Sequence, residues 1–246
     1  LETNMSLFLL SIYNKCMDSK LVKFSLLSDI FKQNGYSLYL VGGTVRDFLL
    51  SLPIDDLDVV TDATPEEMKK FIDGNYRYEK MGSVSFKYEG VHFDITTLRK
   101  EKRYKDARHP LNVKFVKKLN KDVIRRDFTI NGLYMDSSYQ LYDFVNGQKD
   151  LNNKILKMIG NPNKRLKEDP LRILRAIRFA LTYDMIFDKK LKRAMKKNIH
   201  QLQRLNQEKI KLQTEEQAIE LLNRYDISKS KYLILKKLIC LKQIAM

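Results

Sequence analysis

The chain has 246 residues, of which 43% are hydrophobic, so it can bury a core in one or two compact units. Its 46 Lys and Arg residues exceed its 30 Asp and Glu residues, and the formal net charge of +16 favours a polyanionic partner such as RNA or DNA. Two cysteines and three histidines are too few and too scattered for a disulfide framework or a zinc site, so we expect a reducing compartment, the cytoplasm or an organellar matrix.

One apolar run, Leu7 to Tyr13, lies near the start of the chain. It is too short to span a membrane and has no basic region before it, so we expect neither an anchor nor a signal peptide. We expect a helix packed on the domain instead. The chain begins at Leu1, and Met5 could be the native start.

A helix and a strand are predicted next along the chain. Apolar residues recur at helical spacing from Phe24 to Phe31, and the pattern stops at Asn34-Gly35, a typical C-terminal cap. An apolar strand over residues 37–41 follows.

A double-glycine turn ends this strand. Gly42 and Gly43 lead into a helix that carries Arg46. Because glycine lets the backbone approach a phosphate, and because N–H groups at a helix N-terminus bind anions, we interpret the turn as a phosphate site to which Arg46 adds a guanidinium. A plain turn is the alternative.

A carboxylate pair follows the turn. Only Leu57 separates Asp56 from Asp58, so on a strand both carboxylates would point to one face. Two like charges this close need cations, and Mg2+ prefers oxygen ligands. We therefore expect these residues to hold two Mg2+ ions for nucleotidyl transfer, although Asp-x-Asp alone also occurs in solvated loops.

The following segment predicts a helix and a hairpin. Thr64-Pro65-Glu66-Glu67 offers a capping box, so a helix should run to about Ile72. Residues 83–88 and 91–97 read as two strands joined through Glu89-Gly90. Strands and helices mix without a regular βαβ repeat, which indicates an α+β fold.

Two further polar groups could complete a nucleotidyl-transfer site. Asp94 on the second hairpin strand could bring a third carboxylate that orients or deprotonates an attacking 3′-hydroxyl, unless it is an acid at a strand edge. Asp127 and Asn131 lie four apart on a predicted helix and suit a ribose, while Arg126 suits a triphosphate. A basic helix with a solvated face is the alternative for this segment.

Basic residues are concentrated in two stretches. Residues 99–126 contain 12 Lys or Arg residues against three acids, and a second basic stretch runs from Lys189 to Lys211. RNA or DNA is the expected partner, with an affinity that falls steeply with salt.

From about residue 151 the pattern becomes helical, with few glycines and no run that suggests a strand. Asp169 and Arg172 lie three apart and share a helix face. A carboxylate accepts from an exocyclic amine and a guanidinium donates to a ring nitrogen or carbonyl, so this pair could accept CTP and ATP and reject UTP and GTP. A capping acid with an intrahelical ion pair is the alternative.

These residues belong to three motifs that occur in order. The run from Leu40 to Arg178 closely resembles the class II (bacterial-type) tRNA nucleotidyltransferases, which are CCA-adding enzymes of the poly(A) polymerase family within the DNA polymerase β superfamily. The motifs are Leu-Val-Gly-Gly-Thr-Val-Arg-Asp with Asp-Leu-Asp, Arg-Arg-Asp-Phe-Thr-Ile-Asn, and Glu-Asp-Pro-Leu-Arg-Ile-Leu-Arg-Ala-Ile-Arg-Phe.

The resemblance assigns roles to the site residues. Asp56 and Asp58 would hold the two Mg2+ ions, and Asp169 and Arg172 would be the protein template for the incoming base, with Arg175 and Arg178 nearby. The predicted contacts to the triphosphate are Gly43, Arg46 and Arg126, and those to the sugar are Asp127 and Asn131.

The resemblance also implies the domain organisation. We expect a polymerase β-like nucleotidyltransferase head of a small mixed sheet with helices over residues 1–136. A helical neck with the base-recognition helix would span residues 137–200, and a short helical body, which could be truncated relative to its relatives, residues 201–246.

Three segments bear on the substrate. Met81-Gly82-Ser83-Val84-Ser85-Phe86 lacks the Gly-Arg-Arg-Phe-like stretch of bacterial poly(A) polymerases, and the segment with Asp106 and Arg108 resembles the flexible loop of full CCA-adding enzymes. Glu208-Lys209 replaces the family's Glu-Arg motif, and Lys lacks the planar fork of Arg. The basic helices from Lys189 onward and an oligomeric partner could hold the tRNA, or the substrate could be smaller than a full tRNA.

The resemblance implies an Mg2+-dependent, template-independent enzyme that adds CCA to the acceptor end of tRNA from CTP and ATP. A CC-only, A-only or poly(A)-adding RNA nucleotidyltransferase is the enzymatic alternative. A non-catalytic RNA-binding protein that retains the fold is the alternative from another class.

Overall fold

The computed structural model describes residues 19–54, 57–104 and 110–204. Asp56, the loop residues Asp106 and Arg108, and the segment at Glu208 lie outside the described residues, as does the predicted helix over Leu7–Tyr13. In the described part of the chain, no helix is long and apolar enough to cross a membrane.

The chain divides into two compact units. The first comprises residues 1–153 and 157–160, and the second comprises residues 154–156 and 161–246.

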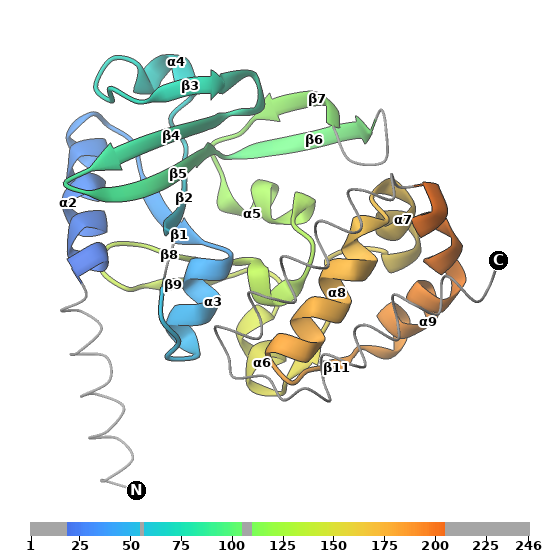
Figure 1. Ribbon diagram of the computed structural model, residues 1–246. Helices are drawn as coiled ribbons and strands as arrows, with labels where there is room; N and C mark the ends of the chain where they lie inside the picture. Colours follow the sequence, from blue (N-terminus) through green and yellow to red (C-terminus); the bar gives the residue numbers. More distant parts are fainter. Residues whose placement is uncertain (1–18, 55–56, 105–109, 205–246) are drawn as a thin grey trace, which may run out of the picture. The chain divides into compact units, whose positions relative to one another are not determined.

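The first unit is built on a seven-stranded mixed sheet with the strand order β3-β4-β5-β2-β1-β8-β9 (Figure 1). Neighbouring strands are antiparallel except β2 and β5, which are parallel. The expected α+β fold class is confirmed. The strands of this sheet are β1 (Leu38–Val41), β2 (Leu57–Thr61), β3 (Asn75–Tyr78), β4 (Ser83–Tyr88), β5 (Val91–Thr97), β8 (Leu133–Met135) and β9 (Leu141–Asp143).

Short helices and a second hairpin complete the first unit. Strands β6 (Arg99–Tyr104) and β7 (Pro110–Phe115) form a separate antiparallel pair that follows β5 along the chain (Figure 1). The helical elements are α2 (Ser19–Gln33), α3 (Gly43–Leu49), α4 (Pro65–Met68), η1 (Glu79–Met81), α5 (Leu119–Asp122), η2 (Val123–Arg125), η3 (Thr129–Asn131) and α6 (Gly147–Asn152).

Several predicted elements are confirmed. Helix α2 buries Phe24 and Leu27 in the core and is followed by Gly35, whose φ of 82° suits a glycine cap. Strands β4 and β5 form the predicted hairpin, and Glu89 and Gly90 both have positive φ at its turn.

The predicted capping box at helix α4 is also confirmed. The Thr64 hydroxyl accepts from the backbone N–H of Glu67, and the Glu67 carboxylate accepts from the backbone N–H of Thr64 at 2.7 Å. The helix ends at Met68 rather than near Ile72, because the backbone N–H groups after Met68 bond partly to carbonyls three residues back and tighten the last turn.

Alternate residues of strand β2 face different apolar clusters. Leu57 and Val59 are buried in the main core with helices α2 and α3, whereas Val60 belongs to a smaller cluster that includes Tyr134. Since side chains alternate along a strand, Asp58 lies on the same face as Val60. One face of the sheet therefore packs on the main core, and Asp58 lies on the opposite face.

The second unit is mainly helical. A short parallel pair, β10 (Ile155–Leu156) with β11 (Ile186–Phe187), corrects our expectation that no strand occurs after residue 151; two residues per strand are too few to show alternation in the sequence. Its helices are α7 (Pro162–Glu168), α8 (Leu171–Thr182), α9 (Lys189–Asn198) and η4 (Ile199–Arg204).

The expected domain boundaries at residues 136 and 200 stay predictions. Strand β9 pairs with β8 and so continues the sheet of the first unit past residue 136. Helix η4 continues across residue 200. Residues 205–246 of the expected body lie outside the described part.

Replacing Gly147 by Ala should destabilise the first unit by about 3 kcal/mol, because an added Cβ would lie 2.2 Å from the backbone oxygen of Thr129, which cannot move away as a flexible side chain could. The control is Gly90→Ala, where φ is positive and so unfavourable for Ala but no atom lies within 4 Å, and about 1 kcal/mol should be lost. Urea unfolding measures both changes. Equal losses in the two variants would contradict the packing argument.

Candidate active site

Asp58 and Asp94 lie directly opposite each other on the parallel strands β2 and β5. Both residues are exposed, while the residues that flank them on their strands, Leu57 and Val59 or Phe93 and Ile95, are buried. Side chains in register on neighbouring strands point to the same face. The sheet therefore brings the predicted third carboxylate beside Asp58.

The Gly42-Gly43 turn lies next to this carboxylate. Gly42 has a φ of 65°, which a residue with a Cβ adopts only with strain. A Cβ added at Gly42 would lie 3.7 Å from Nη1 of Arg126 and 3.8 Å from Oδ2 of Asp58. The turn, a guanidinium and a carboxylate therefore converge, as an anion site beside a metal site requires.

Thr44 connects the turn to strand β2. Its side chain is buried, and its hydroxyl accepts from the backbone N–H of Asp58 at 3.0 Å. This bond fixes the start of the strand against helix α3. The residue after the double glycine thus contributes to the position of Asp58.

Arg46 is buried beneath the turn, with 6% of its surface exposed. Its Nε and Nη2 donate to the two carboxylate oxygens of Asp47 at 3.0 and 2.9 Å, and its Nη1 donates to Oδ1 of Asn131 at 2.7 Å. These bonds orient the guanidinium within the protein. The predicted contact of Arg46 with a triphosphate stays a prediction, and these hydrogen bonds give Arg46 a supporting role.

Asp127 and Asn131 are not both on a helix, which corrects our expectation. Phe128 is extended, and only Thr129 to Asn131 form the short helix η3. The amide of Asn131 nevertheless donates to Oδ1 of Asp127 at 3.2 Å, and the backbone N–H of Phe128 donates to the same oxygen at 2.8 Å. The two predicted sugar-binding residues therefore lie together, joined to Arg46 through Asn131.

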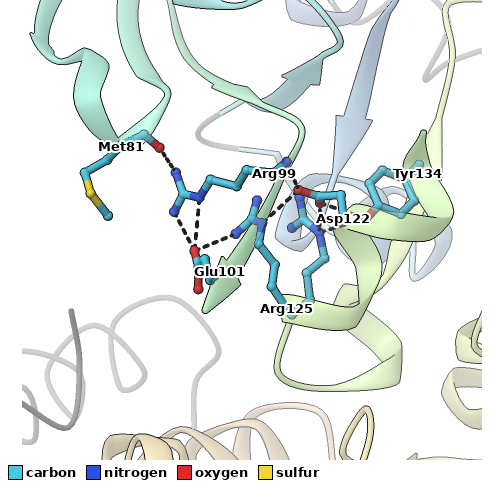
Figure 2. Close-up of polar contacts among 7 residues, drawn as sticks. Met81, Arg99, Glu101, Asp122, Arg125 and Tyr134 are labelled. Carbon is cyan, nitrogen blue, oxygen red and sulfur yellow. Dashed lines mark hydrogen bonds and ion pairs between the residues drawn. The ribbon is translucent and has the colours of Figure 1, made fainter. Parts of the chain in front are cut away.

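A buried carboxylate that sequence reasoning missed, Asp122, holds Arg126 in place. Figure 2 shows Asp122 between Arg125 and Tyr134. Asp122 is 0% exposed, and its Oδ2 accepts from Nε of Arg126 at 3.1 Å and from the Tyr134 hydroxyl at 2.9 Å. Its Oδ1 accepts from Nε of Arg125 at 2.7 Å and from the backbone N–H of Arg99 at 3.0 Å. The sequence signal that could have revealed this network is one acid followed by arginines three and four residues later.

This network shifts the proton affinities of its members. Burial raises the pKa of Asp122, but Arg125 and Arg126 outweigh it, so this pKa lies below its ordinary value. Burial lowers the pKa of Arg126, but Asp122 and Tyr134 outweigh burial, so this pKa lies above its ordinary value. Burial raises the pKa of Tyr134 above its ordinary value. Asp122 thus remains ionised, and Tyr134 remains a hydrogen-bond donor.

The second unit brings Asp169 and Arg172 together at the start of helix α8. Nε of Arg172 lies 3.8 Å from Oδ2 of Asp169, while Oδ1 of Asp169 accepts from the backbone N–H of Leu171 at 3.0 Å. Arg172 is 6% exposed, and its Nη1 donates to the backbone oxygen of Arg165 at 2.7 Å. The pair is thus an ion pair whose members are also held by the backbone.

Arg175 and Arg178 lie on the same helix around Phe179. Their guanidinium carbons are 5.4 and 5.0 Å from the centre of the Phe179 ring, within the range of cation–π contacts. These contacts hold both guanidinium groups beside Phe179, on the helix that also carries Arg172. Their predicted role near the base stays a prediction.

Replacing Asp122 by Asn should cost about 3–5 kcal/mol of unfolding free energy at pH 7, because it leaves buried guanidinium groups without their anion. Since the folded pKa is lowered, the carboxylate stabilises the fold above its unfolded pKa, about 3.9, and this contribution is lost as pH falls through the folded value. Denaturant unfolding should therefore show the difference between wild type and variant shrinking between about pH 5 and pH 2. A difference that does not depend on pH would contradict this role.

Comparison with known proteins identifies the family. The poly(A) polymerase head domain family matches residues 38–157. The CCA-adding enzyme of Staphylococcus epidermidis is 39% identical over 180 residues, which make up 73% of this chain and 45% of that protein.

Solved structures agree. The Bacillus stearothermophilus CCA-adding enzyme in complex with CTP matches with a TM-score of 0.71 and 30% identity over 85% of this chain and 50% of that one. The Thermotoga maritima CCA-adding enzyme complexed with tRNA matches with a TM-score of 0.65 and 27% identity over 85% and 48%. The chain therefore spans about half the length of these relatives.

The motifs, the fold and these matches lead to one assignment, and the resemblance seen in the sequence is confirmed. Residues 38–157 belong to the poly(A) polymerase head domain family, and the first unit has the polymerase β-like head of the CCA-adding enzymes that the chain resembles.

Proposed function

We propose that this chain catalyses the addition of CCA to the 3′ end of tRNA from CTP and ATP. The observation that carries the proposal is the in-register pair Asp58–Asp94 beside the Gly42 turn and Arg126. Relatives of this chain are named CCA-adding enzymes, and one was solved with CTP and another with tRNA. Their shared family supports the same substrates here.

The donor set of the site fits Mg2+. Asp58 and Asp94 offer oxygen ligands from adjacent strands, and Asp56, outside the described residues, would add another. Within the described residues there is no group of three or more His, Cys, Asp or Glu side chains that could hold a metal ion, so Asp56 is needed for a full set. When bound, Mg2+ supplies positive charge that neutralises the triphosphate and activates the attacking hydroxyl.

Different side chains of the first unit then bind the triphosphate, orient the ribose and accept the proton. Arg126 and the N–H groups of the Gly42-Gly43 turn bind the triphosphate, and Asn131 with Asp127 orients the ribose. Asp94 accepts the proton of the 3′-hydroxyl. The hydroxyl oxygen attacks the α-phosphorus of the nucleotide, and pyrophosphate leaves.

Base choice is proposed for the Asp169–Arg172 pair of the second unit. Cytosine and adenine present an amine beside a ring nitrogen, which match a carboxylate acceptor and a guanidinium donor. UTP and GTP would leave these partly buried groups without partners. The backbone contacts of both residues keep the pair in a fixed orientation, as a template requires.

The basic face of helix α9 supports an RNA substrate. Leu191 and Ala194 are buried against the unit, while the basic residues of the helix are exposed. Such a face binds phosphates without reading sequence. The exposed residues are Lys189, Lys190, Lys192, Arg193, Lys196 and Lys197.

Replacing either Asp58 or Asp94 by Asn should lower kcat for CTP incorporation by roughly 100- to 10,000-fold, because a metal ligand or a proton acceptor is lost. The assay uses tRNAs ending before, within and after CCA, and wild-type product should stop at three added nucleotides. EDTA should abolish incorporation.

Asp184→Asn is the control, since this carboxylate is exposed and forms an ion pair with the surface residue Lys154. Full activity in the Asp58 and Asp94 variants would refute the mechanism. Products limited to CC, to a single A, or to a long A tail would instead identify the other nucleotidyltransferase activities.

Replacing Asp169 by Asn should relax base choice, because an amide can donate as well as accept. The preference for CTP over UTP, measured as a ratio of kcat/KM values, should fall by about 100-fold or more. Asp188→Asn is the matched control, since Asp188 caps helix α9 through Lys190 and Leu191 without a proposed role in base choice. An unchanged preference in the Asp169 variant would refute the template assignment.

A further inference from the structure

A chain of alternating charges runs from the β6–β7 hairpin to the phosphate site. In order, its members are Arg99, Glu101, Arg125, Asp122 and Arg126, linked by successive ion pairs. Figure 2 shows the first four of them. Their side chains are 0–14% exposed. Buried charges at this spacing interact more strongly than exposed ones.

Glu101 is the first acid of this chain and lies on strand β6. Its Oε1 accepts from Nε and Nη2 of Arg99 at 3.0 and 2.9 Å, and it lies 3.7 Å from Nη1 of Arg125. Arg99 in turn donates to the backbone oxygen of Met81. Glu101 thus neutralises two guanidinium groups, of which that of Arg125 also pairs with Asp122.

The carboxylate of Asp122 can accept only a limited number of hydrogen bonds. Its two oxygens already accept four hydrogen bonds, from Arg99, Arg125, Arg126 and Tyr134. Without the charge of Glu101, Arg125 would be attracted more strongly to Asp122 and would compete with Arg126 for it. Arg126 is the member whose Nη1 approaches Gly42 at the phosphate site.

We propose that Glu101 is a positioning residue for Arg126 and thereby sets the affinity of the site for the triphosphate group of the incoming nucleotide. Glu101 acts through Arg125 and Asp122 and does not touch the nucleotide. This inference deepens the proposed function and rests on it for the identity of the ligand.

Binding of inorganic tripolyphosphate and of CTP, each with Mg2+, to Glu101→Gln measures the effect. Both ligands should bind about 10-fold more weakly, the size expected of an indirect coupling of this kind. Glu101→Asp keeps the charge and should restore most of the affinity. Glu79→Gln, which alters an exposed carboxylate paired with Lys69, should bind as wild type does.

A double-mutant cycle separates positioning from a general loss of structure. In the Arg126→Lys background, Glu101→Gln should have little further effect on tripolyphosphate binding, because its route to the ligand has been removed. Thermal unfolding of each variant records the structural cost separately. Equal effects of Glu101→Gln in both backgrounds would overturn the proposal.

The outcomes also separate this inference from the proposed function. Wild-type protein that fails to bind tripolyphosphate, or Glu101→Gln protein that binds it normally, overturns the inference. Wild-type protein that shows the expected coupling but incorporates neither CTP nor ATP into tRNA supports the inference and contradicts the proposed function.

Discussion

The parallel pairing of strands β2 and β5 is the constraint on which the candidate site depends. It sets Asp58 opposite Asp94, and a shift by one residue would turn Asp94 toward the main core. The register is determined by burial, since Leu57, Val59, Phe93 and Ile95 must all face that core. The hydrophobic effect, rather than any attraction between the carboxylates, therefore brings two like charges together, and a bound cation would offset their repulsion.

The arginines around this pair have different tasks, although the sequence presents them alike. Arg46 is held by Asp47 and Asn131, so it stiffens the base of the turn. Nε of Arg126 donates to Asp122 and Tyr134, and its Nη1 lies beside Gly42 of the turn. Binding one edge of a guanidinium to a buried carboxylate fixes its direction while presenting the other edge to a phosphate. The buried carboxylate of Asp122 therefore helps to orient the guanidinium group of Arg126.

Local signals predicted much of the fold. The cap at Gly35, the capping box at Thr64 and the β4–β5 hairpin depend on neighbouring residues, and all were found where expected. Features that depend on distant contacts were harder to predict. Nothing near Arg46 in the sequence indicates that its guanidinium will donate a hydrogen bond to Asn131. The sheet continues past residue 136 because β9 pairs with β8. Two-residue strands such as β10 leave no periodic pattern at all.

The Asp169–Arg172 pair shows why motif and geometry must be combined. By spacing alone, these residues are a helix-capping acid and an intrahelical ion pair, and both features are present. The same contacts are what a base-selecting pair needs, because a side chain that must reject the wrong base cannot be free to rotate toward it. The bond from Arg172 to the backbone of Arg165 and the bond from Leu171 to Asp169 restrict both partners. The structural role therefore supports the proposed one, since discrimination between bases requires donors and acceptors whose directions are set before the nucleotide arrives.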